Sequence, residues 1–579
     1  MLTAAAPDRF HAAMPFEARQ SDDGHIEALF LGEGRRPPLL TAEVSDRIEE
    51  MVSAAEADPP TGIIFRADGG GDFQAGVNLE AMAAVGSREE AHAASRRMQL
   101  LYQRLAELPC PVIAAVSGRC LGGGTELILA CHGRIAADAD TTAIALPEIN
   151  LGLIPGYGGT QRLPRLIGQQ AALNMILTGN PVGAREALAS GLIDRLAPPD
   201  HLLEAARDML TDLAAGRSAR LEPGVKLSLT DRMLERTRRG RRMVRERYLR
   251  VTRRRTGGHY PAPELAIEAV GLAAGKIPLA EGLEREAEML ADLVAGDVHP
   301  NLLALLRARQ ALRRPRGIEP ESGNRLDLAA GLDPPAEFIP AFRRLLETVP
   351  WRSGGSAAAA PRVASGHGVL RRLPRAIPPS TVEICWSGSG QPAGFPDTAR
   401  RLIAAAGLNP VFTRSPDVSP GLALIAAYLR EGDRLVREGW EKDRVDEILE
   451  EWGMKHGPFA LAEALGEPWL LLLDELPQRS CPEPLSGQSG RIFAAGDEPD
   501  PTRTVDEVIA ALAQEIERLQ AEVIEPQAEG WLVLDVFVLG GPAFRGGVYG
   551  AARAREREQL EADLVTLARR YGPPYRATP

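Results

Sequence analysis

The chain has 579 residues, of which 44% are apolar and 25% are charged, as is usual in globular proteins. At roughly 100–200 residues per domain, this length predicts about three to five domains. The net charge of −11 argues against nucleic acid as the main partner. The N-terminus lacks a basic segment followed by a long apolar stretch, and no run of about 18 apolar residues occurs anywhere. We therefore expect a cytoplasmic protein without a signal peptide or a transmembrane segment.

Cysteine and histidine usage points away from disulfides and metal. The five cysteines lie far apart and form no C-x-x-C pair, which is typical of reduced thiols. The nine histidines include no H-E-x-x-H motif and no clustered pair. We expect no metal held by protein ligands.

The first 135 residues alternate between short apolar runs and segments with helical spacing. The expected strands are residues 26–31, 62–66 and 111–116, and the expected helices are residues 42–55 and 87–107. Strands that alternate with helices indicate an α/β layered architecture.

A basic stretch covers residues 225–255, with 12 arginines between Arg232 and Arg255. Val244, Tyr248 and Val251 follow helical spacing, so one face of this helix is apolar. The simpler interpretation is a solvated helix packed on a domain. The alternative is contact with an acidic partner or a membrane surface.

Composition changes after a further helical segment at residues 264–313. The next 65 or so residues are rich in proline and glycine and contain SGGSAAAAPRVASG, which is typical of a low-complexity linker. Strand and helix patterns return after residue 380.

The densest chemical signal is the run SGRCLGGGTE, which ends at Glu126. Three glycines before a helix let backbone approach a ligand closely, and free N–H groups at a helix start favour negative charge. Glu148 follows 22 residues later, after a short strand. Two carboxylates that converge on one pocket can divide general acid and base roles. Taken singly, these features also fit a turn, a helix-dipole partner and a surface loop residue, so their joint order carries the interpretation.

Four blocks in one order resemble the crotonase (enoyl-CoA hydratase/isomerase) superfamily, over roughly residues 20–210. The blocks are FQAGVNLEAM (73–82), PVIAAVSGRCLGGGTELILACHGRIA (111–136), PEINLGLIPGYGGTQRLPRLIG (147–168) and LTGNPVGAREALASGLID (177–194). The resemblance implies a crotonase-like ββα spiral and an enoyl-CoA hydratase. Glu126 and Glu148 match the two catalytic glutamates of the family, which activate water for attack at C3 and protonate C2.

The same resemblance implies an oxyanion hole made of the backbone N–H groups of Ala75 and Gly123, which would stabilise the enolate. Asn78 stands where the family usually has aspartate. Because that aspartate mostly structures the loop, we expect the replacement to have a small effect.

Later blocks resemble the multifunctional α-subunit of fatty-acid β-oxidation: TGGHYPAPELAIEAV (256–270), LREGDRLVREGWEKDRVDEILEEWGMKHGPFALAEALG (429–466) and GGPAFRGGVYGA (540–551). This resemblance implies linker helices after the hydratase and mostly α-helical 3-hydroxyacyl-CoA dehydrogenase-like domains at the C-terminus. The expected domains are 1–215 (hydratase), 216–314 (helical linker region), 315–380 (low-complexity linker or degenerate remnant of the dinucleotide-binding domain), and 381–475 and 476–579 (first and second dehydrogenase-like helical domains).

The dinucleotide-binding domain of that family is largely missing here. Such a domain needs strand, G-x-G-x-x-G, helix and an acidic residue, and nothing between Arg313 and Ser380 provides them. Glu383 matches the glutamate that orients the dehydrogenase histidine, but Arg371 stands in the register of that histidine. We therefore predict no NAD cofactor and a lost dehydrogenase activity.

The leading interpretation is hydration of trans-2-enoyl-CoA in fatty-acid β-oxidation, with the acyl-CoA thioester as substrate. A Δ3–Δ2 enoyl-CoA isomerase, an intact bifunctional hydratase–dehydrogenase and a catalytically silent acyl-CoA-binding scaffold subunit are the alternatives. Crotonase relatives are commonly trimers, and the multifunctional α-subunits pair with thiolase β-subunits. We expect either a homo-oligomer or a thiolase partner.

Overall fold

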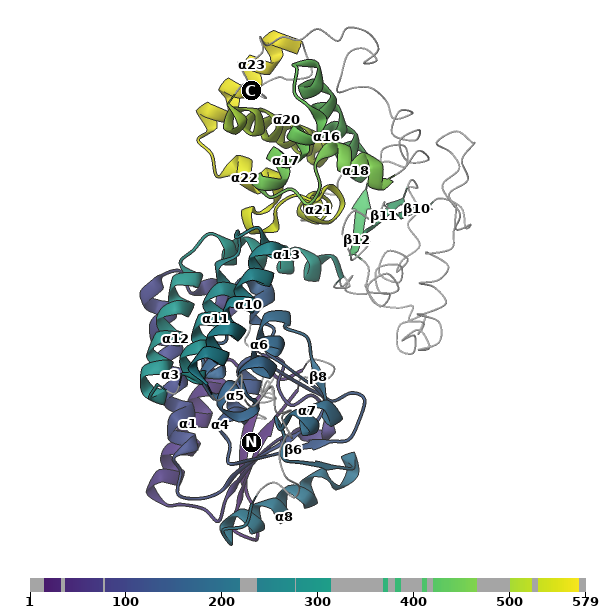
Figure 1. Cartoon of the computed structure of the whole chain (residues 1–579). Coiled ribbons are helices and arrows are strands. Elements are labelled where there is room, and N and C mark those ends of the chain that lie inside the picture. The colour runs from purple at the N-terminus through teal and green to yellow at the C-terminus, as the bar shows by residue number, and fades with distance from the viewer. Residues whose placement is uncertain are drawn as a thin grey trace, which may run out of the picture. The chain divides into compact units, whose positions relative to one another are not determined.

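The computed structural model describes residues 15–32, 37–76, 79–218, 237–275, 277–313, 368–372, 381–386, 409–413, 420–465, 500–522 and 530–571. The chain divides into two compact units, Met1–Pro300 and Asn301–Pro579 (Figure 1). The first unit combines sheets with helices, and the second is mostly helical. Both features agree with the fold class expected from the sequence.

A six-stranded sheet forms the centre of the first unit, in the order β1-β2-β3-β4-β6-β9. Its strands are β1 (Phe16–Gln20), β2 (Ile26–Phe30), β3 (Ile63–Ala67), β4 (Val112–Val116), β6 (Gly133–Ala137) and β9 (Arg195–Ala197). The first two strands pair antiparallel, and all later pairs are parallel. Parallel strands covered on both faces favour continuous apolar runs, which explains sequences such as VIAAV in β4.

A second sheet has three short strands in the order β5-β7-β8. They are β5 (Arg119–Leu121), β7 (Ala143–Ala145) and β8 (Val182–Gly183). The helices of this part are α1 (Ala42–Ala57), α2 (Leu79–Ala84), α3 (Arg88–Ala106), α4 (Gly123–Ala130), α5 (Gly159–Ile167), α6 (Gln169–Thr178), α7 (Ala184–Ser190) and α8 (Leu202–Ala214). The strands and helices expected before residue 117 are confirmed to within about two residues.

The two faces of the six-stranded sheet carry separate apolar cores, because side chains alternate along each strand. Ile63 and Phe65 of β3 belong to the larger core, whereas Ile64 between them belongs to the smaller one. Helices α1, α3 and α4 complete the larger core, and α8 covers the other face with Ala206 and Met209. The larger core also includes Leu127 and Ile128 of α4.

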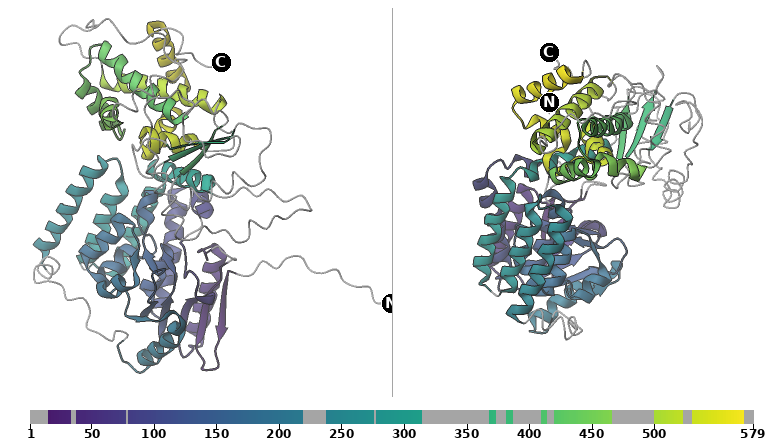
Figure 2. Two further views of the ribbon diagram at one scale, coloured as in Figure 1. Left: turned by 90° about the vertical axis from the view of Figure 1, so that its right-hand side faces the viewer. Right: turned by 45° about the horizontal axis from the view of Figure 1, so that its top comes forward.

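Three further helices belong to the first unit: α10 (Arg238–Thr256), α11 (Pro261–Ala274) and α12 (Leu279–Val294). They lie side by side, with α11 against α5 and α6, and α12 against α3 (Figures 1 and 2). Ile267 and Val270 of α11 are fully buried in the larger core. Where the structure describes it, the segment expected to be a helical linker is mostly helical, and its helices α10, α11 and α12 pack into the first unit, which extends to Pro300.

The arginine-rich helix α10 packs on this unit through part of its apolar face. Val244 is buried, and the Tyr248 hydroxyl donates to Asn174 Oδ1 at 2.6 Å. Val251 remains 42% exposed. These contacts agree with the simpler interpretation of α10, a solvated helix that packs on a domain.

The described elements of the second unit are helices and one three-stranded sheet. The helices are α13 (Val298–Arg313), α16 (Pro420–Arg437), α17 (Lys442–Trp452), α18 (Pro458–Leu465), α20 (Pro501–Glu522), α21 (Gly530–Leu534), a π-helix (Asp535–Leu539), α22 (Gly547–Arg553) and α23 (Arg557–Tyr571). The strands are β10 (Gly368–Arg372), β11 (Thr381–Trp386) and β12 (Asn409–Thr413). Strand β11 pairs antiparallel with β10 and parallel with β12.

The register of the β10–β11 pair places Arg371 opposite Glu383. These are the two positions at which the dehydrogenase resemblance calls for a histidine and its glutamate. Most of residues 315–380 lie outside the described residues, so the degenerate dinucleotide domain and the missing NAD site stay predictions.

No single helix in the described ranges is long and apolar enough to cross a membrane. The bent pair formed by α12 and α13 passes a test of length and composition only. In α12 the apolar residues Leu283, Met289 and Leu293 are buried, as in a core helix of a globular unit.

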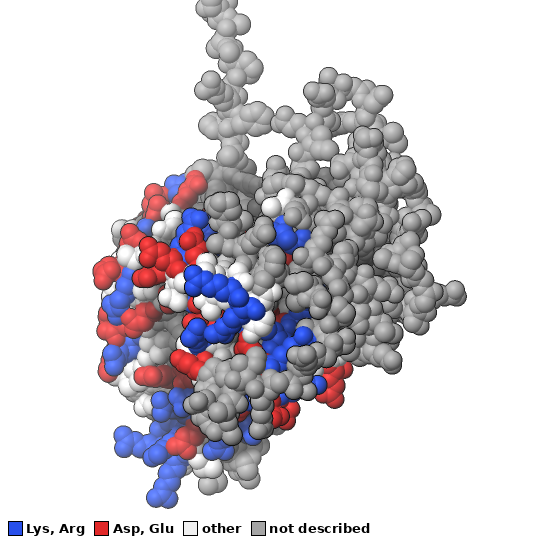
Figure 3. Space-filling view, turned by 90° about the horizontal axis from the view of Figure 1, so that it is seen from above, with Lys and Arg blue, Asp and Glu red and all other residues white. Residues whose placement is uncertain are grey.

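A buried ion network joins α16 to α20 in the second unit. Arg434 is 5% exposed, and its guanidinium lies 2.7 Å from Glu431, 2.6 Å from Glu438 and 3.5 Å from Glu507. On the face seen from above, by contrast, exposed charges of both signs are interspersed (Figure 3). Exposed pairs contribute about 0–1 kcal/mol each, whereas breaking a buried pair leaves a desolvated charge.

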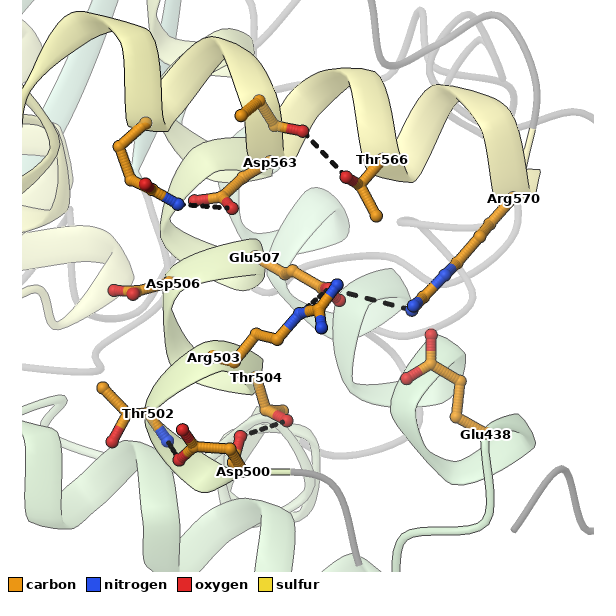
Figure 4. A network of polar contacts seen from close by, with 12 residues as sticks. Glu438, Asp500, Thr502, Arg503, Thr504, Asp506, Glu507, Asp563, Thr566 and Arg570 are labelled. Carbon is orange, nitrogen blue, oxygen red and sulfur yellow. Dashed lines mark hydrogen bonds and ion pairs between the residues drawn. The ribbon is translucent and has the colours of Figure 1, made fainter.

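Glu507 of α20 also faces arginines at the rim of this network. Its Oε1 lies 3.5 Å from Arg503 and 3.7 Å from Arg570 of α23 (Figure 4). Burial raises the pKa of Glu507, and Arg434 lowers it. Among the residues that the structure describes, Arg434 is the cation that contacts three carboxylates of this network.

We expect Arg434→Met to destabilise the second unit by about 3–5 kcal/mol, because three buried carboxylates lose their shared cation. Urea unfolding followed by tryptophan fluorescence measures this, since all six tryptophans lie after residue 350, in the second unit. The matched control is Arg444→Met, which removes a surface pair with Glu447 and should change stability by less than about 1 kcal/mol. Overlapping unfolding curves for the two variants would contradict the prediction.

Candidate active site

The glycine triplet predicted from the sequence lies at the start of α4, where space is tight. Gly122 has φ 55° and ψ −124°, a conformation that residues with a side chain rarely adopt. A Cβ atom at Gly122 would lie 2.8 Å from Glu148 Oε1, and one at Gly124 would lie 2.4 Å from Gln74 Oε1. The triplet thus lets Glu148 approach the backbone at the first turn of α4.

The N–H group of Gly123 points out of the first turn of α4. Gly122 N–H donates to the Ala145 carbonyl at 2.9 Å, but Gly123 N–H has no partner within the part of the chain that the structure describes. The Gly123 carbonyl accepts a hydrogen bond of 3.0 Å from the buried Tyr102 hydroxyl. Gly123 therefore offers a fixed N–H at the positive end of a helix dipole, as an oxyanion donor requires.

Ala75, the second oxyanion donor expected from the resemblance, does not suit that role. Its N–H donates to the Pro38 carbonyl at 2.9 Å, so it already has a partner. The N–H of the next residue, Gly76, donates to Gln74 Oε1 at 3.0 Å. The following positions, Val77 and Asn78, lie outside the described residues.

Glu126 lies in the first turn of α4 and is only 2% exposed. Its Oε1 accepts two backbone hydrogen bonds, from Tyr157 N–H at 2.7 Å and from Gly159 N–H at 2.8 Å. Burial raises the pKa of Glu126 well above its usual value, the nearby negative charges of Glu148 and Glu286 raise it further, and the two N–H groups lower it. The carboxyl group is thus held in place and retains its proton more strongly than in water.

Glu148 begins the short 3-10 helix Glu148–Leu151, which follows β7. Its Oε2 is buried and has no hydrogen-bond partner among the described residues. Burial raises the pKa of Glu148 to about 7. The two glutamates predicted from the sequence therefore meet beside the glycine triplet, and their charges interact.

A third glutamate, Glu286 of α12, was not anticipated. It is fully buried, and burial raises its pKa to about 7. Its Oε1 accepts from Gly158 N–H at 2.6 Å, and its Oε2 accepts from Thr160 N–H at 2.9 Å. The local signal is slight: Glu286 falls on the helix face of Leu283 and Leu290, where an apolar residue is the rule.

Arg162 is a buried cation whose charge acts on Glu286 and Glu126. It is 8% exposed and donates to the Tyr157 carbonyl at 3.1 Å and to Gln103 Oε1 at 3.2 Å. Burial lowers the pKa of Arg162, while Glu286 and Glu126 raise it. One cation cannot balance three buried carboxylates, and the pKa of each of the three glutamates is raised.

No His, Cys, Asp and Glu side chains in the described ranges, these three glutamates included, are arranged so that three of them could hold a metal ion. The chemistry that this geometry supports directly is proton transfer. One carboxylate can accept a proton, its neighbour can donate one, and the Gly123 N–H can stabilise a negative oxygen.

Residues 36–259 match the family described as enoyl-CoA hydratase/isomerase, and they form a crotonase-family domain. The chain also resembles the protein named fatty acid oxidation complex subunit alpha. It is 37% identical to that protein of Shewanella loihica over 304 residues, which cover 52% of this chain and 42% of the relative. The identity to the protein of the same name from Shewanella putrefaciens is 34% over 307 residues, which again cover 52% of this chain and 42% of the relative. The matches thus span less than half the length of these relatives.

Among solved structures, the chain is similar to an enoyl-CoA hydratase from Bacillus anthracis. The identity is 25%, the alignment covers 51% of this chain and 96% of that one, and the TM-score is 0.33. Since this TM-score is low, the assignment of the domain rests on the family match.

We expect Glu148→Gln to stabilise the first unit at pH 8. A glutamate has a pKa of about 4.5 when exposed, but that of Glu148 is about 7 in the folded protein, so the folded state binds the proton more tightly. The stabilisation by the bound proton is present below about pH 4.5 and is lost as the pH rises through about 7. Removing the carboxylate should therefore add roughly 1–3 kcal/mol at pH 8 and less at pH 5.

Differential scanning calorimetry measures this difference, and the transition of the first unit is the one that tryptophan fluorescence does not report. Glu268→Gln is the control, because Glu268 is exposed on α11. A Glu148→Gln protein that melts at or below the wild-type temperature at pH 8 would contradict the prediction.

Proposed function

We propose that this chain is an enoyl-CoA hydratase, which adds water to trans-2-enoyl-CoA to give 3-hydroxyacyl-CoA. The observation that carries the proposal is the meeting of Glu126 and Glu148 beside the Gly123 N–H, inside a crotonase-family domain. The relatives named fatty acid oxidation complex subunit alpha support a place in fatty-acid β-oxidation.

The reaction needs two proton transfers that balance. The ionised carboxylate of the pair accepts a proton from water as the water oxygen forms a bond to C3. The protonated carboxyl group donates its proton to C2, and the electrons of the C2–C3 double bond pass through the thioester enolate to form the new C2–H bond. The pair holds the same number of protons before and after, but their positions are exchanged, so one proton must pass between the two carboxyl groups before the next turnover.

The thioester oxygen becomes negative as C3 is attacked. Gly123 N–H, at the positive end of α4, would donate to that oxygen and stabilise the enolate. In general one well-placed donor of this kind is worth a factor of about 10²–10³ in rate.

We expect the purified protein to hydrate crotonyl-CoA, and Glu126→Gln and Glu148→Gln each to lower kcat by about 10²–10⁴-fold, because each removes one general acid or base. Loss of the ultraviolet absorbance of the conjugated enoyl thioester measures the rate. Glu268→Gln should keep the wild-type rate. A wild-type protein that binds crotonyl-CoA without turnover would instead be an acyl-CoA-binding scaffold.

We also propose that the dehydrogenase step of the multifunctional relatives is absent here, since Arg371 is paired with Glu383 in the β10–β11 register. We expect no oxidation of NADH by acetoacetyl-CoA with the pure protein. The absorbance of NADH gives the rate, and added 3-hydroxyacyl-CoA dehydrogenase provides the positive control. Saturable NADH oxidation would establish the intact bifunctional enzyme instead.

A further inference from the structure

The segment between Tyr157 and Thr160 is held by two carboxylates in alternation. Tyr157 N–H and Gly159 N–H donate to Glu126, whereas Gly158 N–H and Thr160 N–H donate to Glu286. The four distances lie between 2.6 and 2.9 Å. These N–H groups lie around the first turn of α5, where no partner within the helix is available to them.

The two carboxylates use their oxygens differently. Glu286 accepts at both: Oε1 also receives Gln99 Nε2 at 3.0 Å, and Oε2 also receives the Thr160 hydroxyl at 2.5 Å. Four donors fill the acceptor positions of this carboxylate, which leaves it nothing to offer a substrate. Glu126 accepts both of its backbone bonds at Oε1, so its Oε2 stays available for chemistry.

A second set of contacts ties the same segment to α3 and α12. Gln99 Nε2 donates to the Gly156 carbonyl at 3.1 Å and to the Leu283 carbonyl at 2.9 Å. At Gly282, a Cβ atom would lie 2.2 Å from Gln161 Oε1, so α12 approaches α5 as closely as a glycine allows. The close packing of α12 against α3 and α5 thus holds Glu286 next to the turn at residues 157–160.

Glu286 lies outside the segment that matches the hydratase/isomerase family. The match to the hydratase/isomerase family ends at residue 259, and α12 begins at Leu279. The turn that orients Glu126 is therefore completed by a helix from outside the matched domain.

We infer that Glu286 is a positioning residue for hydration: it fixes the turn at 157–160, and that turn fixes Glu126. The inference rests on the proposed function, since it concerns the geometry of the proposed general acid or base. Without the carboxylate of Glu286, the N–H groups of Gly158 and Thr160 lose their acceptor, and the turn no longer holds Glu126 in one place. A displacement of about 1 Å at a catalytic group can cost about 10²-fold in rate.

The test compares Glu286→Gln with Glu288→Gln, a variant on the same helix whose carboxylate faces solvent and pairs with Arg285. We expect Glu286→Gln to lower kcat for crotonyl-CoA by about 10–100-fold with KM within about threefold, because substrate contacts are unchanged. Glu288→Gln should keep both parameters.

The pH profile separates positioning from general loss of structure. The charged groups that face Glu286 are Glu126, Glu148 and Arg162. The negative charge of Glu286 raises the pKa of Glu126 and of Glu148. Its removal should therefore lower these pKa values and move the acidic limb of the pH profile of kcat to lower pH. A variant that had only lost structure would keep the wild-type profile at a reduced amplitude.

Thr160→Val provides a milder variant in case Glu286→Gln does not fold. It removes the hydroxyl bond to Glu286 and keeps the N–H bond, so we expect a smaller fall in kcat with KM unchanged.

Three results overturn the inference. The first is a kcat for Glu286→Gln within twofold of Glu288→Gln, and the second is a fall in kcat with an unshifted acidic limb. If Glu286→Gln does not fold, the third is a wild-type kcat for Thr160→Val. A wild-type protein without hydratase activity overturns the proposed function and this inference together, whereas an active wild type with an unaffected Glu286→Gln overturns the inference alone.

Discussion

A carboxylate that leaves water must find donors to replace its hydration, and in this protein that requirement shapes the site. Glu126 is buried in the first unit, and two backbone N–H groups of one turn supply its hydrogen bonds. The same turn has two more N–H groups, and these require an acceptor of their own. Glu286 meets that requirement. This one set of hydrogen bonds joins α4, the start of α5 and α12 at the site.

Much of the fold could be read from the sequence because periodicity is a local signal. The apolar runs of β3 and β4 and the helical spacing of α1 and α3 predict the elements that form. The pair Glu126 and Glu148 could also be predicted, since a glycine triplet before a helix and a second glutamate after a short strand are close in the chain. Periodicity and motifs of neighbouring residues therefore identify candidate site residues when these residues lie close together in the chain.

What the sequence could not reveal depends on contacts between distant segments. Ala75 has the right place in its loop, but only the structure shows that Pro38 already accepts its N–H. Glu286 lies 138 residues after Glu148, in a helix with several other glutamates, and nothing nearby in the chain marks it. The length of the first unit is a similar case, because the expected boundary at residue 215 follows the end of the crotonase resemblance, whereas the packing continues to Pro300.

The close approach of Gly282 to Gln161 bears on how such domains can be recombined. A crossover placed at the end of the family match would transplant the sheet, the glycine triplet, Glu126 and Glu148, yet it would leave α12 behind. The incoming helix of the host protein would then need a glycine and a glutamate four residues apart, in this order and on the inner face. The shortest segment that keeps this hydrogen-bonding pattern is thus longer than the family match, because it must include α12.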